Sequence, residues 1–133
     1  MKVFHKYCII SLILLASCAH RTDARYITTQ NKSTSEIYCF YTDRELYKID
    51  DVPRIGLATS ENENNISLIG LLFWEDYIKS CDNQKIRYYI IKKDSVDKYG
   101  WKIIVKKNIF NKKYLFTVED LDKINWALKY HGE

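Results

Sequence analysis

From residue 25 onward the chain alternates between short runs of β-branched and aromatic residues and short polar turns, and this spacing limits the folds open to it. Runs of this composition favour strands, and turns this close together favour antiparallel pairing. The runs span 25–30, 36–42, 52–59, 66–78, 85–93, 101–107, 113–118 and 123–130. The pattern predicts an all-β fold of about eight short strands. The expected form is an antiparallel β-sandwich, with an immunoglobulin-like arrangement as one version of it.

Local signals refine this expectation. The first two runs flank the turn-forming sequence NKST, which predicts a first hairpin. The last run is ambiguous. Thr117 and Asp120 have the spacing of a helix capping box, whereas the large residues at 124, 126, 128 and 130 alternate as on one face of a strand. We predict a strand for 123–130, and a helix within 118–130 remains the alternative. The three tryptophans, Trp74, Trp101 and Trp126, are expected in the core.

Before these runs lies a stretch typical of a secretory leader. Two lysines precede an apolar run from 7 to 16, which is shorter than the roughly 20 residues that a membrane-spanning helix needs. The end of this stretch resembles the bacterial lipobox at all four positions, which are Leu15, Ala16, Ser17 and Cys18. That resemblance implies cleavage before Cys18 and acylation of this cysteine. Residues 1–17 would then be the lipoprotein signal peptide, 18–24 a lipidated tether and 25–133 the folded domain.

The leader implies a cellular address. Ala19, where an aspartate would resemble an inner-membrane retention signal, favours an outer-membrane lipid anchor that faces the periplasm. An ordinary signal peptide cut near Cys18 is the alternative. In an oxidising compartment, the remaining pair Cys39 and Cys81 predicts one disulfide.

Charge is distributed unevenly along the chain. Residues 36–65 carry seven acidic and three basic side chains, whereas 79–113 carry eleven basic and three acidic ones. The lysine clusters fit either solvated strand edges or a surface for an acidic partner. Lysines interleaved with aromatic residues also occur in nucleic-acid-binding proteins, but an exported protein seldom meets nucleic acid.

The sequence offers no catalytic motif. The histidines, His5, His20 and His131, lie in the leader, in the tether and near the end, and no phosphate-binding loop, metalloprotease motif or nucleophile elbow occurs. We therefore predict a protein that is not an enzyme and that uses no cofactor, no metal and no small-molecule substrate.

The overall layout resembles the small periplasmic lipoproteins that act as immunity proteins of type VI secretion systems. The residues that carry the resemblance are the lipobox, the apolar run around Cys39 and the long apolar run that ends shortly before Cys81. It implies a binding module whose protein partner is a secreted toxin. The predicted partner-binding residues are Tyr88, Tyr89, Lys92, Lys93, Tyr99 and Trp101. Two alternatives remain: a structural lipoprotein of a secretion or envelope assembly, and an unlipidated secreted effector of eukaryotic or viral origin.

Overall fold

The computed structural model describes residues 23–132 except 53, 60–61, 69 and 71. The predicted signal peptide, Cys18 and most of the predicted tether lie outside the described residues. The described part is mostly β, with seven strands in two antiparallel-dominated sheets and four α-helices. The strands are β1 (Tyr26–Asn31), β2 (Ile37–Thr42), β3 (Ile55–Ala58), β4 (Glu63–Ser67), β5 (Ile86–Lys92), β6 (Lys112–Phe116) and β7 (Ala127–Tyr130). The helices are α2 (Trp74–Ser80), α3 (Lys93–Tyr99), α4 (Trp101–Lys107) and α5 (Val118–Lys123), with short 3-10 turns η1 (Ile49–Asp51) and η2 (Asp82–Gln84).

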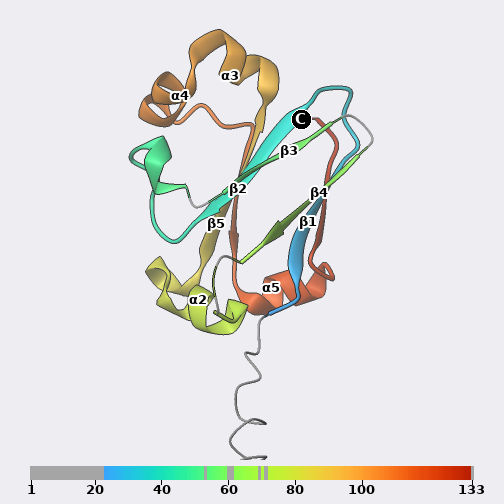
Figure 1. The fold of residues 1–133 in the computed structure, drawn as a ribbon, viewed down its shortest axis with the longest axis vertical. Coiled ribbons are helices and arrows are strands. Elements are labelled where there is room, and N and C mark those ends of the chain that lie inside the picture. Colours follow the sequence, from blue (N-terminus) through green and yellow to red (C-terminus); the bar gives the residue numbers. More distant parts are fainter. Residues whose placement is uncertain (1–22, 53, 60–61, 69, 71, 133) are drawn as a thin grey trace, which may run out of the picture.

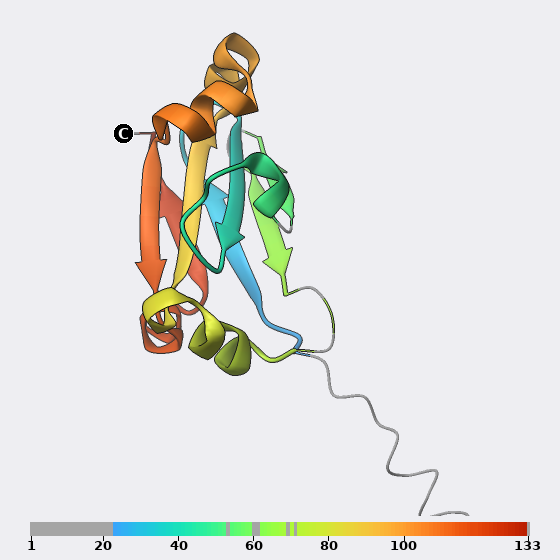
Figure 2. The same ribbon diagram turned by 90° about the vertical axis from the view of Figure 1, so that its left-hand side faces the viewer.

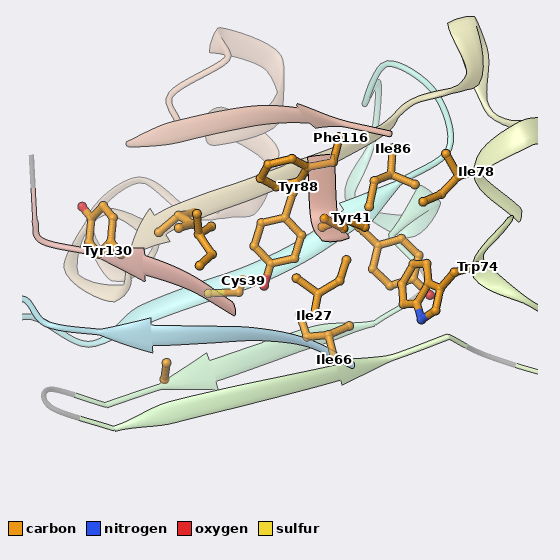
Figure 3. Packing of buried hydrophobic residues seen from close by; sticks show 14 of the residues in the cluster. Ile27, Cys39, Tyr41, Ile66, Trp74, Ile78, Ile86, Tyr88, Phe116 and Tyr130 are labelled. Carbon is orange, nitrogen blue, oxygen red and sulfur yellow. The ribbon is translucent and has the colours of Figure 1, made fainter. Parts of the chain in front are cut away.

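The strands form two sheets that share one core. The smaller sheet has the order β4-β1-β7, and the larger has the order β3-β2-β5-β6 (Figure 1). All pairs are antiparallel except β1 with β7, which is parallel. Residues from both sheets, from α2 and from α5 make one buried cluster, part of which Figure 3 shows. The core therefore lies between the sheets, and α2 and α5 close one end of it.

The outer face of the larger sheet is covered as well. Strand β5 is buried on both sides, because Tyr88 and Ile90 face the core between the sheets while Tyr89 and Ile91 lie in two separate clusters. Those clusters contain residues of α3, α4 and the segment around η1. This explains why the run at 85–93 is nearly continuous in apolar residues, as strands covered on both faces are. The larger sheet thus has the smaller sheet on one face and parts of α3, α4 and the η1 segment on the other, while α2 and α5 lie at one end (Figure 1).

Several predicted strands are helices, so the all-β prediction is wrong in this respect. In α4, Trp101, Ile104 and Val105 point into the outer clusters with the spacing of a helical face, and the lysines point outward. Gly100, with φ 71°, and Asn108, with φ 52°, bound this helix with conformations that a continuous strand does not use. In α2, Trp74, Tyr77 and Ile78 have the same spacing. Periodicity, and not β propensity, was the stronger signal here.

Two further predictions need correction. Strands β1 and β2 belong to different sheets, so the segment between them crosses from one sheet to the other and forms no hairpin. In the tail, the capping box forms: Asp120 N donates to Thr117 Oγ1 and Thr117 N donates to Asp120 Oδ2, both at 3.1 Å. Residues 118–123 are therefore the helix α5, and only 127–130 form a strand.

The predicted disulfide is absent from the structure. Cys39 and Cys81 are both free, and both are buried. Cys39 lies within β2, whereas the residue after Cys81 donates its N–H to the carbonyl of Asp43, beyond the end of that strand (3.0 Å). Along an extended strand this places the two cysteines on the order of 10 Å apart, farther than the roughly 7 Å between Cα atoms that a disulfide tolerates. Burial raises the pKa of each thiol to about 11.

An ionic cluster holds the start of the described chain against α2. Asp23 Oδ2 accepts a hydrogen bond from the backbone N–H of Trp74, the first residue of α2 (3.0 Å), and pairs with Arg25 Nη2 (2.6 Å). The same guanidinium nitrogen contacts Glu75 Oε2 at 2.6 Å, and the group lies over the ring of Trp126 at 4.6 Å. Asp23 thus serves as an N-cap supplied from outside the helix.

This cluster predicts a specific acid sensitivity. The hydrogen bond from Arg25 lowers the pKa of Asp23 to about 2, whereas in the unfolded chain this group has an ordinary pKa near 3.8. The stabilisation is therefore complete above pH 4 and is lost as the pH falls toward 2. We expect Asp23→Asn to lower the free energy of unfolding at pH 7 by about 1 to 2 kcal/mol, since the partly exposed Arg25 is screened by solvent.

Urea titrations at a series of pH values measure this effect. The difference between the wild type and Asp23→Asn should shrink toward zero near pH 2. Asp76→Asn, which replaces an exposed carboxylate of the same helix, is the matched control and should stay within about 0.5 kcal/mol of the wild type. A difference for Asp23→Asn that stays constant from pH 7 to pH 2 would contradict the assignment.

Candidate functional site

The structure separates the predicted partner-binding residues into buried and exposed ones. Tyr88 and Tyr89 are fully buried, so neither can serve as a surface anchor. Trp101 is half-buried, and its ring packs against Tyr38 and Phe40 on the outer face of the larger sheet, with centroid distances of 5.4 and 5.9 Å. It therefore fastens α4 to that sheet.

The charged members of the predicted set differ from one another. Lys93 forms ion pairs with two nearby carboxylates, since its Nζ lies 2.8 Å from Asp97 and 4.0 Å from Glu36. Lys92 lies at the end of β5, directly before α3. Tyr99 is exposed at the end of α3. Lys92, Lys93, Tyr99 and Trp101 thus lie in or around α3 and the start of α4, whereas Tyr88 and Tyr89 lie inside the protein.

Sequence reasoning missed a groove beside this region. It is a cavity of about 470 Å³ between the segment around η1 and the helix α4. Both elements lie on the same outer face of the larger sheet (Figure 2). The lining residues are Tyr47, Lys48, Ile49, Asp50, Lys102, Val105 and Lys106. We call it the η1–α4 groove.

The floor of the groove is rigid and apolar. Val105 and Ile49 belong to a cluster that also contains Phe40 and Tyr89. The rings of Phe40 and Tyr89 stack at 5.0 Å, and Phe110 lies 4.6 Å from Tyr89. Offset and edge contacts between aromatic rings add to the energy of apolar burial. The groove therefore rests on a well-packed aromatic layer.

The rim of the groove is exposed and basic. Tyr47 is 78% exposed, more than any other large hydrophobic residue in the described ranges. Lys48, Lys102 and Lys106 are exposed, and none of them forms an ion pair with another described residue. Asp50 is the one acidic residue that lines it. The rim thus offers an aromatic ring and three uncompensated positive charges.

Two other cavities are less suited to binding a partner. One, of about 330 Å³, lies between α2, η2 and the start of α5, and its lining mixes polar side chains of both charges with Ile78 and Val118. Another, of about 160 Å³, lies beside Tyr130 and His131. Within 23–132 and outside the gaps, no group of three or more His, Cys, Asp or Glu side chains could hold a metal ion. In the same part of the chain, no helix is long and apolar enough to cross a membrane.

The site's chemistry favours contact with a macromolecule. Small-molecule pockets usually hold a few precisely placed polar groups in a buried setting. In the η1–α4 groove the charged groups are exposed ends of long side chains that surround an apolar floor. Comparisons with protein-family models, with curated proteins and with solved structures found no match to this chain.

Proposed function

We propose that this chain is a binding module of the bacterial cell envelope that takes an acidic protein partner in the η1–α4 groove. The observation that carries the proposal is the combination of Tyr47 with three unpaired lysines over an apolar floor. Tyrosine is enriched at the energetic centres of protein interfaces, because it offers a large rigid area and a hydroxyl group. Unpaired positive charges select partners of negative potential and speed their association.

The leader supports the location. Acylation of Cys18 would fix the protein to the outer membrane, in the compartment where a toxin from a neighbouring cell arrives. With the layout that resembles type VI immunity lipoproteins, this makes a delivered toxin with an acidic surface the partner that we propose. The protein would neutralise the toxin by binding it, with no chemical step of its own.

Survival during competition tests the function. A host strain that lacks the gene is exposed to an attacker of its own kind and is complemented with the full-length chain or its variants. We expect the deletion to sensitise the cells and the wild-type chain to protect them. Cys18→Ser should fail because the protein is no longer anchored. A deletion strain that survives as well as its parent would overturn the immunity function.

Groove variants test the surface. Tyr47→Ala should weaken binding of the neutralised toxin by about 30-fold, which corresponds to the roughly 2 kcal/mol of an interface hot spot. Lys102→Glu with Lys106→Glu should also abolish protection. The matched control reverses Lys98 and Lys107, two lysines outside the groove lining, and should protect like the wild type. Equal loss in both charge-reversed pairs would mean that general charge, and not the groove, is responsible.

A further inference from the structure

Two exposed apolar side chains lie where the described chain begins. Leu72 and Phe73 are 49% and 37% exposed, and they directly precede α2. The next residue, Trp74, donates its backbone N–H to Oδ2 of Asp23. Asp23 is the first residue that the structure describes. The ionic cluster of Asp23, Arg25 and Glu75 holds these segments together. The chain that precedes residue 23 therefore joins the domain beside Leu72 and Phe73.

The length of this preceding segment limits the distance between a lipid on Cys18 and the domain. Four residues lie between Cys18 and Asp23. The chain therefore takes five steps from one to the other, and at about 3.5 Å per step a fully extended chain spans at most roughly 17 Å. An anchor in the membrane would hold the α2 end of the domain within that distance of the lipid surface. At this distance even a weak contact between the domain and the lipid surface can persist, because the tether keeps the two together.

We propose that the α2 end of the domain lies against the lipid surface and that Leu72 and Phe73 enter the membrane interface. The inference rests on the proposed acylation of Cys18. Aliphatic and aromatic side chains are well suited to the boundary between headgroups and acyl chains. The two helices at this end of the molecule, α2 and α5, carry five carboxylates and two lysines between them, so their net charge is negative. The contact is therefore apolar in origin and does not depend on anionic lipid.

This orientation points α3 and the basic helix α4 away from the membrane. α3 and α4 lie at the opposite end of the molecule from α2 and α5 (Figure 1). Strand β5 connects the two ends with seven residues, which span about 23 Å at 3.3 Å per residue. That separation exceeds two Debye lengths of about 8 Å at physiological ionic strength, so anionic headgroups attract the distant lysines little. The η1–α4 groove then faces the compartment.

Site-specific labelling tests this orientation in the full-length lipidated protein, reconstituted in vesicles. An environment-sensitive fluorophore is attached to Leu72→Cys, and in a matched control to Ile103→Cys, which is 37% exposed on α4. Cys39 and Cys81 are buried. In the lipidated protein Cys8 has left with the signal peptide and the thiol of Cys18 is acylated, so the introduced thiol is the accessible one. We expect lipids with a quencher near the headgroup to quench the label at 72 and to leave the label at 103 unchanged. The result should be the same in phosphatidylcholine and in phosphatidylglycerol vesicles.

Each other outcome overturns the inference in a recognisable way. Equal quenching at both positions, or quenching at 103 alone, would mean that another face meets the lipid. Quenching at 72 only with phosphatidylglycerol would mean that charge drives the contact. A water-exposed label at 72 would show that no lipid covers Leu72 and Phe73. A label shielded equally without vesicles would mean that the tether or a second copy of the chain covers them. Mass measurement of Cys18 is separate: an unmodified residue defeats the proposed anchor itself.

Discussion

Trp74→Ala should lower the free energy of unfolding by about 3 to 5 kcal/mol, the range for truncating a large buried aromatic side chain. Trp74 is fully buried, and its ring contacts those of Tyr41 and Trp126 at centroid distances of 5.4 and 5.5 Å. Its Nε1 donates to the carbonyl of Arg25 at 3.2 Å. It thus joins α2, the larger sheet and the start of β1. Since domains of this size are stable by only about 5 to 15 kcal/mol, the variant should be close to unfolding.

Trp74→Phe is the informative companion variant. It keeps an aromatic ring in the core but loses part of the ring volume and the hydrogen bond to Arg25, so we expect a loss of about 1 to 2 kcal/mol. Urea denaturation followed by circular dichroism measures both variants. If Trp74→Ala changed the stability by less than about 1 kcal/mol, the position would not be the core junction described above.

Tyr88→Ala should have an effect of similar size, about 3 to 5 kcal/mol. Tyr88 is fully buried in β5, and its hydroxyl lies 2.6 Å from the hydroxyl of Thr29 in β1. The two hydroxyl groups connect the larger sheet to the smaller one across the core, as the position of Tyr88 in Figure 3 illustrates. Burial raises the pKa of Tyr88 well above its usual value, so its hydroxyl stays protonated.

Smaller substitutions separate the ring from the hydroxyl. Tyr88→Phe should cost about 1 to 3 kcal/mol, because the hydroxyl of Thr29 then loses a buried partner. Adding Thr29→Val to Tyr88→Phe removes both polar groups, and the pair should cost less than the sum of the single changes. Thermal or urea unfolding of the four proteins completes the cycle. Additive losses would mean that the two hydroxyl groups do not stabilise each other.

The β-rich fold could be predicted from the sequence because several strand segments are rich in β-branched and aromatic residues, which pack well in sheets. Strand β5 is the clearest case, since IRYYIIK has no helical periodicity and lies between two apolar layers. The segment WKIIVKK looks similar in composition but is a helix, because its apolar residues at 101, 104 and 105 share a helical face. Residue type alone could not separate the two. The spacing and the flanking Gly100 and Asn108 could have done so.

The sequence indicates only one of the two walls of the η1–α4 groove. The concentration of lysines in 79–113 pointed to the region of α4, and Lys102 and Lys106 do line the groove. The other wall comes from Tyr47 to Asp50, in a stretch with more acidic than basic residues, and no local pattern links it to α4. Tyr88 and Tyr89 were chosen as anchors for their residue type, but β5 is the strand that both layers cover. Burial of this kind depends on sheet order, which a single sequence does not reveal.

The parallel pairing of β1 with β7 has a consequence for when the domain can form. β1 is the middle strand of its sheet, and one of its two neighbours comes from the last few residues of the described chain. Synthesis delivers the beginning of a chain first, so β1 must wait until the residues of β7 have been made before its second edge is paired. Contacts between distant parts of a sequence slow folding. The smaller sheet is therefore completed only after β7 has emerged, which leaves a long interval during which β1 has one unpaired edge. On the export route that we propose, this is the interval in which an unfinished polypeptide can pass through a translocation pore.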